Sequence, residues 1–584
     1  MWNLGKFFRY FSRTDYALTA VCAVLVLAQV FLDLRIPEFM QEMTNALQRG
    51  TDTSFVIEIG ERMLLCALAS LVVSILCGTC AARVAASVSR EMRAREFANV
   101  QRFSTEDMDR FSASSLITRT TNDVSNLLNF LARSLQMFIR APILGVWALY
   151  KIQAGAWQWT VATAATMVVL VMVTAIVLHY ALPRFKRIQW LIDDVNRATR
   201  ENISGTRVVR AYNAEEYQQR KFDSANDVLL ENNITVSRMM APLPALTASL
   251  TNILMLGIYW IGASLIVSAG DVDTQMGLFS DMIVFSTYAT MVLGSLMLIV
   301  GIFRGMPRML VSIRRINEVV DHVPSMEDGS YEGEGKERGS IEFRSVSFSY
   351  PDMDSEVLHD VSFKVEKGQT LAIIGPTGCG KSTMLSLMAR LYDVDSGEVL
   401  VDGVPVKDYK QSTLHSKIGF VPQKPMIFSA DVRENVCLGD DLEKRTDEEI
   451  WAALKIAQAD GFIDSLDSNL DSKVSQYGLN MSGGQKQRIG IARAVCKDPE
   501  FLILDDSFSA LDYKTDLDLR TAIRRNLRGT TCVIVAQRVG TIRDADLILV
   551  MEDGRIIDRG THDQLMRTCG MYRDIAEAQM EGGE

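Results

Sequence analysis

The chain has 584 residues, of which 48% are hydrophobic and 23% are charged, and its formal net charge is -10. This length is too great for one domain. The apolar share is high for a soluble protein with so many charges, so we expect the apolar residues to be concentrated in one part of the chain. Nothing in the sequence indicates nucleic-acid binding.

The N-terminal residues 1–15, MWNLGKFFRYFSRTD, combine aromatic and basic side chains. A helix here would place Leu4, Phe7, Phe8 and Phe11 on one face, which favours an elbow helix lying in the membrane interface over an ordinary cytosolic turn.

Six segments of residues 16–320 contain the run of about 20 apolar residues that a helix needs to cross a bilayer. Basic residues before the first segment, and after the second and fourth, predict that these sides are cytoplasmic, with both termini inside. The first segment is too long for a cleavable signal, so it remains as an anchor. The predicted spans are 16–36, 56–82, 131–155, 157–182, 243–269 and 277–305.

The polar stretches after the second and fourth spans have helical periodicity, which predicts long helices that project into the cytosol. Residues 321–340 are polar and rich in Gly and acids, so they predict a linker. The remainder, 341–584, alternates short strands with amphipathic helices. We therefore expect an all-α polytopic membrane domain followed by an α/β domain.

The second domain contains a phosphate-binding motif. The sequence LAIIGPTGCGKST fits a buried strand, a Gly-rich loop and a helix start, with the pattern G-x-x-x-x-G-K-[ST] from Gly375 to Ser382. Backbone N–H groups of the loop would approach ATP phosphates, Lys381 would supply a charge, and Ser382 would offer an oxygen to Mg²⁺. The predicted ATP-binding loop residues are Gly375, Pro376, Thr377, Gly378, Cys379, Gly380, Lys381, Ser382 and Thr383.

A second strand carries acids to the same sheet edge. The run FLILDD predicts a buried parallel strand whose C-terminal end presents Asp505 and Asp506. Ligands bind at this edge in α/β sheets, so we expect the Asp505 carboxylate to help hold the metal ion. Farther upstream, MSGGQ precedes a helix, and the N-terminus of that helix favours an anion.

Together, the Gly-rich loop, the SGGQ sequence and the strand ending in Asp505 resemble the nucleotide-binding domain of ABC transporters, and the six spans make the whole chain similar to an exporter-type half-transporter. The resemblance implies that Tyr350 stacks on adenine and that Gln423 contacts Mg²⁺. It also implies coupling helices near 121–123 and 205–214. The implied signature toward the partner's ATP is Met481, Ser482, Gly483, Gly484 and Gln485, and the implied D-loop is Ser509, Ala510, Leu511 and Asp512.

The chain departs from the family pattern at two catalytic positions. The family has Glu after the metal aspartate and His near the γ-phosphate, whereas this chain has Asp506 and Gln537. The shorter side chain withdraws its carboxylate by about 1.5 Å from the attacking water. Glutamine donates a hydrogen bond but cannot become a cation. Because the signature is kept, we predict a heterodimer with a second half-transporter that carries Glu and His at these positions.

Three alternatives to the heterodimeric exporter stay open: a homodimer with an aspartate base, an ATP-gated regulator or channel subunit, and an importer of the same architecture. Methionines near the last two spans favour a hydrophobic or amphiphilic small-molecule substrate, a drug or a lipid, although such residues more often pack helices. We expect the protein to lie in a plasma membrane, namely a bacterial inner membrane, with its ATPase domain in the cytoplasm. Cys77 and Cys80 are expected to serve helix packing.

Overall fold

The computed structural model describes residues 5–153, 156–351, 353, 355–438 and 445–581. The chain forms two compact units. The helical unit comprises 1–100 and 114–322, and the sheet unit comprises 101–113 and 323–584. The sheet unit is therefore discontinuous in sequence, because a short piece from the N-terminal half of the chain belongs to it.

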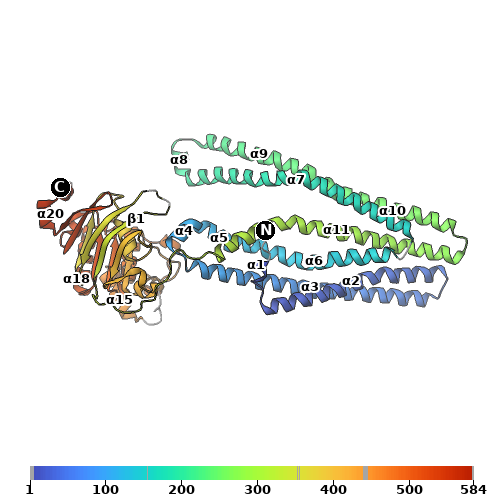
Figure 1. Cartoon of the computed structure of the whole chain (residues 1–584), viewed down its shortest axis with the longest axis horizontal. Helices are drawn as coiled ribbons and strands as arrows, with labels where there is room; N and C mark the ends of the chain where they lie inside the picture. The colour runs from blue at the N-terminus through green and yellow to red at the C-terminus, as the bar shows by residue number, and fades with distance from the viewer. Residues whose placement is uncertain (1–4, 154–155, 352, 354, 439–444, 582–584) are drawn as a thin grey trace. The chain divides into compact units, whose positions relative to one another are not determined.

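The helical unit consists of long helices. In Figure 1, α2 and α3 lie side by side, and α7 and α9 form an antiparallel pair that α8 joins at its tip. The helices are α1 (Gly5–Phe8), α2 (Arg13–Gln48), α3 (Thr53–Val100), α5 (Ala113–Thr118), η1 (Arg119–Asp123, a π-helix), α6 (Val124–Gln153), α7 (Trp157–Ser204), α8 (Thr206–Ala211), α9 (Glu215–Met240), α10 (Pro242–Ser268) and α11 (Val272–Val320).

The N-terminal helix is shorter than the sequence predicts. Among the described residues before α2, the helical ones are Gly5–Phe8, and Ser12 caps the first turn of α2. Leu4 lies outside the described residues. Phe7 is buried and Phe8 is half exposed, and the ring centroids of Phe7, Phe8 and Phe11 lie 5.4 to 5.8 Å apart, so these aromatic side chains cluster. That the segment lies in the membrane interface stays a prediction. Arg9 and Tyr10 donate hydrogen bonds to the Asn317 side chain (2.8 and 2.6 Å), which ties this segment to α11.

Five helices among the described residues are long and apolar enough to cross a membrane. They are α2, α3, α7, the continuous helix that includes α9 and α10, and α11 up to Ile302. The predicted third span lies in α6, which is less apolar and contains Arg133, Arg140 and Lys151. Because α6 packs against α2, α3 and α11, it belongs to the same bundle, and its crossing of the membrane stays a prediction.

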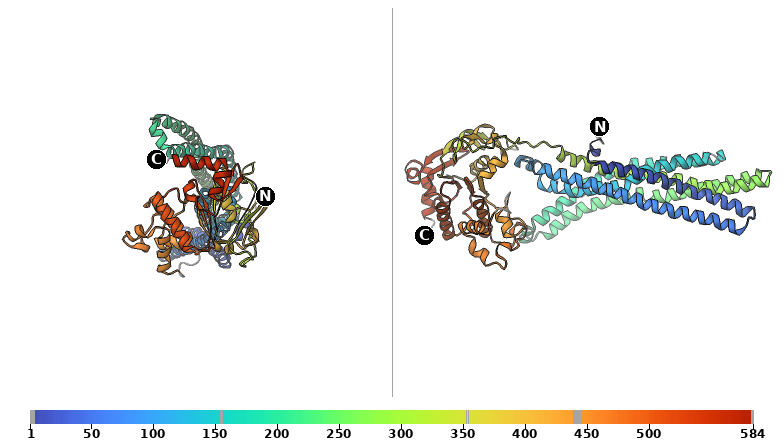
Figure 2. Two further views of the ribbon diagram at one scale, coloured as in Figure 1. Left: turned by 90° about the vertical axis from the view of Figure 1, so that its left-hand side faces the viewer. Right: turned by 90° about the horizontal axis from the view of Figure 1, so that it is seen from below.

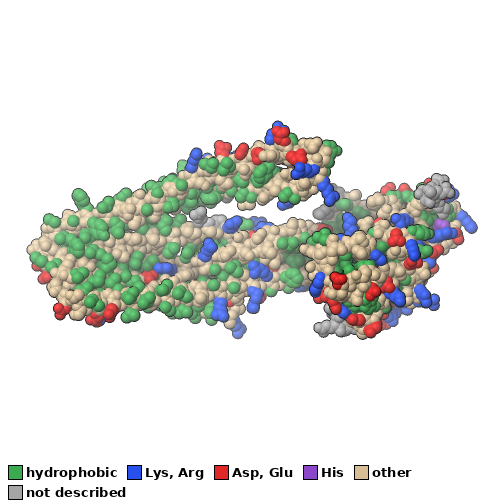
Figure 3. Space-filling model, turned by 180° about the vertical axis from the view of Figure 1, so that it is seen from behind, with side chains coloured by type: hydrophobic (Ala, Val, Ile, Leu, Met, Phe, Trp, Pro, Cys, Tyr) green, Lys and Arg blue, Asp and Glu red, His purple; other side chains and the backbone are tan. Residues whose placement is uncertain are grey.

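The helices are far longer than a bilayer requires. α3 and α7 have 48 residues each and α11 has 49, whereas about 20 suffice to span the hydrocarbon core. The extensions that helical periodicity predicts are thus present. On the face shown in Figure 3, hydrophobic side chains cover much of the helical unit, and charged side chains cluster where α7 and α9 meet α8.

Three ionisable side chains within the bundle have polar partners. Arg140 of α6 forms an ion pair with Asp33 of α2 (2.9 Å), and the Ser70 hydroxyl donates to the other Asp33 oxygen (2.6 Å). Gln41 donates to Asp281 (2.5 Å). These contacts meet the requirement that charges among apolar helices be paired or hydrogen-bonded.

The sheet unit contains two sheets with different strand patterns. A four-stranded antiparallel sheet has the order β2-β1-β4-β5, and a six-stranded sheet has the order β10-β9-β3-β8-β7-β6, in which only β10 is antiparallel to its neighbour. The strands are β1 (Ile341–Phe348), β2 (Leu358–Val365), β3 (Thr370–Ile374), β4 (Ser396–Val401), β5 (Val404–Pro405), β6 (Ile418–Val421), β7 (Phe501–Asp505), β8 (Thr531–Val535), β9 (Leu547–Glu552) and β10 (Arg555–Gly560).

Helices of the sheet unit connect and cover these strands, as the views in Figure 2 show. They are α4 (Thr105–Phe111), α12 (Lys381–Met388), α13 (Gln411–Lys417), α14 (Val432–Val436), α15 (Asp447–Ile456), α16 (Asp460–Asp464), α17 (Gly483–Cys496), α18 (Tyr513–Asn526), α19 (Val539–Ile542), α20 (His562–Thr568) and α21 (Gly570–Glu581), with short 3₁₀ turns η2 (Val406–Asp408), η3 (Asn469–Asp471) and η4 (Gln476–Gly478).

The segment predicted as a linker packs on the sheet unit. Residues 321–340 contain no helix or strand. Tyr331 nevertheless packs edge-on against Tyr409 (5.1 Å between ring centroids), and Arg390 donates to the Glu327 carbonyl oxygen (2.8 Å). From Val323 onward this segment is therefore part of the sheet unit rather than a free tether.

Candidate nucleotide site

Four adjacent parallel strands deliver the predicted site residues to one sheet edge. β3, β8, β7 and β6 are neighbours in that order, and their C-terminal ends lead into the Gly-rich loop, Gln537, Asp505–Asp506 and Gln423, respectively. All five residues of β7 are buried, as its continuous apolar run predicts. The fold thus assembles, from segments far apart in sequence, the residues that the sequence singled out.

The Gly-rich loop needs glycine at two positions for different reasons. A Cβ on Gly375 would lie 2.2 Å from the Met551 carbonyl oxygen, so the strand end and the loop are packed too closely for a side chain. Gly380 precedes α12 with a φ of 96°, a left-handed conformation that other residues rarely adopt. The loop therefore turns directly into the N-terminus of α12, where backbone N–H groups favour an anion.

Oxygen and nitrogen groups converge behind the loop. The Ser382 hydroxyl donates to Asp505 (3.0 Å), and the Lys381 ammonium donates to the carbonyl oxygens of Gly375 (2.8 Å) and Pro376 (2.6 Å). Burial raises the pKa of the Asp505 carboxyl, Asp506 adds to the rise, and Ser382 and Lys381 oppose it. Ser382, Asp505 and the Gln423 amide supply oxygen donors, the type that Mg²⁺ prefers, so these residues fit the predicted metal.

Asp506 lies where the chain turns away from β7. Its φ of 44° is left-handed, and its backbone N–H donates to Val535 O (3.0 Å). One carboxylate oxygen, Oδ2, accepts hydrogen bonds from the side-chain amides of Gln537 (3.1 Å) and Gln423 (3.3 Å). Asp506 is only 8% exposed, and it borders a cavity of about 680 Å³ together with Gln537 and Ser509. The two departures from the family pattern thus contact each other directly.

Tyr350, which is predicted to stack on adenine, lies in a cluster of aromatic side chains. Tyr350 packs edge-on against Phe348 (5.0 Å) and Tyr392 (5.2 Å), and its hydroxyl lies 3.1 Å from the hydroxyl of Thr383, just after the loop. The cluster fixes the Tyr350 ring beside the start of α12. Sequence reasoning missed Tyr392, because an aromatic residue in a loop after a helix carries no spacing signal.

The predicted signature begins α17. Ser482 is the N-cap, and it forms a capping box with Gln485: Ser482 N–H donates to Gln485 Oε1 (2.8 Å) and Gln485 N–H donates to Ser482 Oγ (3.3 Å). Gly483 has no atom within 4 Å of a hypothetical Cβ. The helix N-terminus is thus ordered by side chains that keep its remaining N–H groups available.

The predicted D-loop residues follow Asp506 in a compact turn. The Ser509 hydroxyl donates to Asp506 O (2.9 Å), and Leu511 is buried. Asp512 caps α18 by accepting from the Thr515 N–H (3.0 Å) and hydroxyl (2.7 Å), and these hydrogen bonds lower the pKa of its carboxyl. A Cβ on Gly484 would lie 3.2 Å from Ala510 O, so this turn and the start of α17 are in contact.

Both expected coupling segments lie in the helical unit. Thr121 to Asp123 lie in η1 of the helical unit, whereas residues 101–113, with α4, belong to the sheet unit. Ser325 N–H donates to Asp107 (3.1 Å), and the Tyr392 hydroxyl donates to Asp109 (3.3 Å). The role of residues 121–123 as a coupling segment, which the family resemblance implies, stays a prediction. The second expected segment, 205–214, contains α8 and stays a prediction.

Two further contacts lay outside sequence reasoning. Gln579 of α21 donates to Gln537 O (2.7 Å) and accepts from Val539 N–H (2.8 Å), so the C-terminal helix supports the loop that carries Gln537. Cys77 lies 3.2 Å from Cys22 of α2, sulfur to sulfur. All nine cysteines are free, and Cys77 packs between helices as predicted.

Comparison with known proteins gives consistent matches along the chain. The family described as ABC transporter transmembrane region matches residues 19–296, and the family described as ABC transporter matches 358–509. An uncharacterized ABC transporter ATP-binding protein of Mycobacterium tuberculosis is 33% identical over 575 residues, which cover 96% of each chain. The Bacillus subtilis ABC transporter ATP-binding protein YfiB is 34% identical over 571 residues, with 97% of each chain covered.

Two further matches concern a named activity and a fold. An ATP-dependent lipid A-core flippase of Pseudomonas fluorescens is 32% identical over 499 residues, 84% of this chain and 80% of its own. The solved structure of a bacterial Atm1-family ABC exporter with ATP bound superimposes with a TM-score of 0.81 at 23% identity, covering 97% of this chain and 98% of its own. This second likeness concerns the fold alone.

Proposed function

Because the chain belongs to the ABC transporter family, whose ATPase domain couples ATP hydrolysis to transport, we propose that it is one half of a heterodimeric exporter with a slow ATP site of its own. In this proposal the Gly-rich loop, Lys381 and Tyr350 bind ATP, and Ser382, Gln423 and Asp505 hold Mg²⁺. The metal would neutralise phosphate charge. The SGGQ end of α17 completes the site of a different chain.

The observation that carries the proposal is the surroundings of Asp506. Its carboxylate is one methylene shorter than that of glutamate, and one of its oxygens already accepts from two amides. A general base must approach to about 2.6–3.2 Å of the proton it takes. Both amide partners are neutral and cannot carry a proton from the water. A water beside the γ-phosphate would therefore be held and activated poorly.

The signature end supports the second half of the proposal. Ser482, Gly484 and Gln485 match the family pattern, and the capping box orders the start of the helix that presents them. A chain that keeps this end while losing its base is useful to a partner that has the base. We therefore propose that the partner carries Glu and His at the positions of Asp506 and Gln537.

The proposed cargo is a hydrophobic or amphiphilic small molecule, a drug or a lipid, exported across a bacterial plasma membrane with the sheet unit in the cytoplasm. The similar protein named a lipid A-core flippase supports a lipid-like substrate. Of the methionines near the last two spans, Met282, Met291 and Met297 pack against the helical core. Their flexible side chains are able to follow substrates of varied shape.

The test is ATP turnover by the purified full-length chain, alone and then co-purified with a half-transporter encoded beside it. We expect slow turnover from the lone chain and turnover at least about tenfold faster from the pair, since one activated base is worth roughly 10²–10⁴-fold. Lys381→Ala in this chain should leave most of the pair's turnover. Rapid turnover by the lone chain would instead establish a homodimer in which Asp506 suffices.

A further inference from the structure

A glutamate occupies the end of a buried, mostly apolar stripe on α3. The buried face of this helix repeats every three or four residues, as a packed helix requires, and Glu96 is only 1% exposed. Its position continues the stripe one turn beyond Met92. The buried residues of the second half of the stripe are Cys77, Ala81, Val84, Ala85, Val88, Ser89, Met92 and Glu96.

Glu96 lies outside the membrane-spanning part of α3, since the predicted span ends at residue 82. There α3 packs against η1 and α11. Val88 and Met92 contact the core formed with Val124 of α6 and Ile316 of α11. The glutamate is therefore at the junction of three helices that extend from the membrane bundle.

Neither carboxylate oxygen of Glu96 has a hydrogen-bond partner among the described residues. Its basic neighbours are engaged elsewhere. Arg93 of α3 donates to Thr120 O (3.2 Å), and Arg119 of η1 donates to Arg315 O (2.6 Å) and pairs with Glu318 (3.1 Å). We call Glu96 with Arg93, Arg119, Thr120 and Asp123 the Glu96 junction.

The remaining charges at the Glu96 junction come from η1 and α11. Asp123 is buried, accepts from the Ser312 hydroxyl (2.8 Å) and pairs with Arg315 (3.1 Å). Its negative charge is therefore balanced by Arg315 and not by a contact with Glu96. A second ionised carboxylate close to it, out of water and without a donor, is strongly disfavoured.

Protonation removes this conflict. Burial raises the pKa of the Glu96 carboxyl to about 7, Asp123 adds to the rise, and Arg119, Arg93 and Thr120 oppose it. The folded protein therefore binds this proton more tightly than the unfolded chain does. The stabilising contribution is complete below about pH 4.5 and is lost as the pH rises through about 7.

The element facing Glu96 is itself irregular. η1 (Arg119–Asp123) is a π-helix between α5 and α6, a wide turn that is rare and is often found at functional sites. Arg119, Thr120 and Asp123 all belong to it, so a change of charge on Glu96 acts on this π-helical segment.

We propose that Glu96 is a proton-binding site: the neutral side chain keeps α3 packed on η1 and α11, and ionisation loosens the Glu96 junction. This site is separate from the nucleotide site, and the proposal does not depend on the heterodimer. It makes the cytosolic ends of these helices sensitive to pH near neutrality.

The direct test is an infrared titration of the full-length protein in lipid nanodiscs. We expect a protonated-carboxyl band that disappears with a midpoint near pH 7, and that is missing in Glu96→Gln. The matched control is Glu91→Gln on the same helix, because the Glu91 side chain is 42% exposed and paired with Arg95 (2.7 Å). A wild-type protein with no such band, or a band that persists in Glu96→Gln, would overturn the proposal.

Hydrogen exchange tests the structural consequence. Exchange of residues 116–124, corrected for the intrinsic effect of pH, should rise roughly threefold or more between about pH 6 and pH 8 in wild type and stay flat in Glu96→Gln. Glu96→Met, which continues the apolar stripe, should also stay flat and serves if the glutamine variant does not fold. Equal pH dependence in wild type and both variants would refute the role of Glu96.

Discussion

The sheet edge at Asp506 and the N-terminus of α17 both suit a phosphate group, but only α17 keeps the family's sequence pattern. At the sheet edge two positions depart from the family pattern, and they hydrogen-bond each other. At α17 the SGGQ sequence is kept and capped by its own side chains. Under the proposed function, this difference would mean that binding a nucleotide and hydrolysing it make separate demands on one domain.

The largest effect is expected from Gly484→Asp at the start of α17. The new side chain would press toward Ala510 O and place a negative charge where the partner's ATP is expected. Turnover by the assembled pair should fall roughly 100-fold or more, the scale for losing a preorganised donor to a reacting phosphate. Gly461→Asp is the control, since Gly461 of α16 has open space around it. Undiminished turnover by the pair carrying Gly484→Asp would show that the start of α17 does not take part in ATP hydrolysis.

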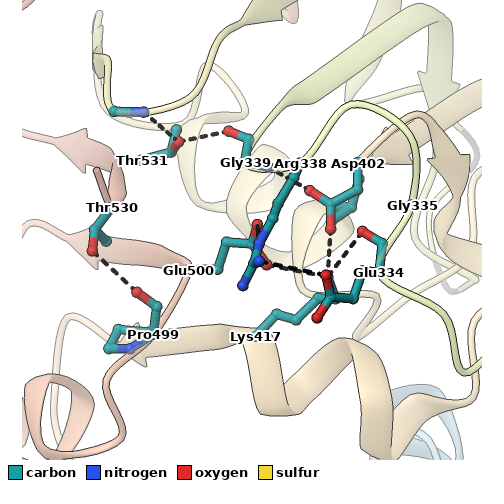
Figure 4. A network of polar contacts seen from close by, with 12 residues as sticks. Glu334, Gly335, Arg338, Gly339, Asp402, Lys417, Pro499, Glu500, Thr530 and Thr531 are labelled. Atoms are coloured by element: carbon teal, nitrogen blue, oxygen red, sulfur yellow. Dashed lines mark hydrogen bonds and ion pairs between the residues drawn. The ribbon is translucent and has the colours of Figure 1, made fainter.

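β7, which leads into Asp506, is anchored at its other end by a largely buried ionic network. Lys417 pairs with Asp402 (2.5 Å) and with Glu500 (3.1 Å), which immediately precedes β7 (Figure 4). Lys417→Met would leave the buried Asp402 carboxylate and the partly buried Glu500 carboxylate without this cation. The sheet unit should lose about 3–5 kcal/mol of unfolding free energy.

Denaturant unfolding, with nucleotide binding as the readout of the folded sheet unit, would measure this loss. Lys407→Met is the control, because Lys407 is exposed. A change below about 1 kcal/mol, the range of a surface ion pair, would show that the network does not anchor β7.

Alkylation of Cys379 should separate ATP binding at the loop from the function of α17. The thiol is 5% exposed and lies 3.7 Å from the Lys381 ammonium, so an added group would occupy the space of the phosphates. ATP affinity should fall more than about tenfold, or 1.4 kcal/mol, and bound ATP should protect the thiol. Cys379→Ser controls for reaction elsewhere. Unchanged affinity after modification verified by mass spectrometry would refute the steric argument.

Asp506→Glu should give the smallest change, a gain of about tenfold in single-turnover hydrolysis by the lone chain, since lengthening the base restores reach but leaves Gln537 neutral. Asp498→Glu is a matched control, because Asp498 is exposed and also has a left-handed φ (55°). A rate that stays the same in Asp506→Glu would mean that Gln537, rather than the length of the base, limits hydrolysis.

Periodicity and composition predicted the parts of the fold that repeat. The apolar run of β7 and the glycines before Lys381 are local signals with one physical cause each, so the sheet edge was predictable. The long helices followed from residues spaced three or four apart. α6 was harder to assign, because Arg133, Arg140 and Lys151 dilute its apolar run, and only the packing partners show where it belongs.

The contacts that were missed join distant segments without a pattern. Gln579 supports the Gln537 loop across 42 positions of sequence, and nothing near Gln579 marks it as different from other surface glutamines. Glu96 escaped for the opposite reason. A glutamate among Arg93 and Arg95 in a charged stretch is typical of a solvated helix face, and burial alone shows that it is not one.

The inclusion of residues 101–113 in the sheet unit has a practical consequence for dissecting the protein. A fragment beginning at Val323 would lack α4, and so would lose the partners of Ser325 and Tyr392. Such a fragment is an incomplete domain, and its face around Tyr392 would be a receptor for the missing piece. A synthetic peptide of residues 101–113 is accordingly the natural reagent for restoring it by fragment complementation.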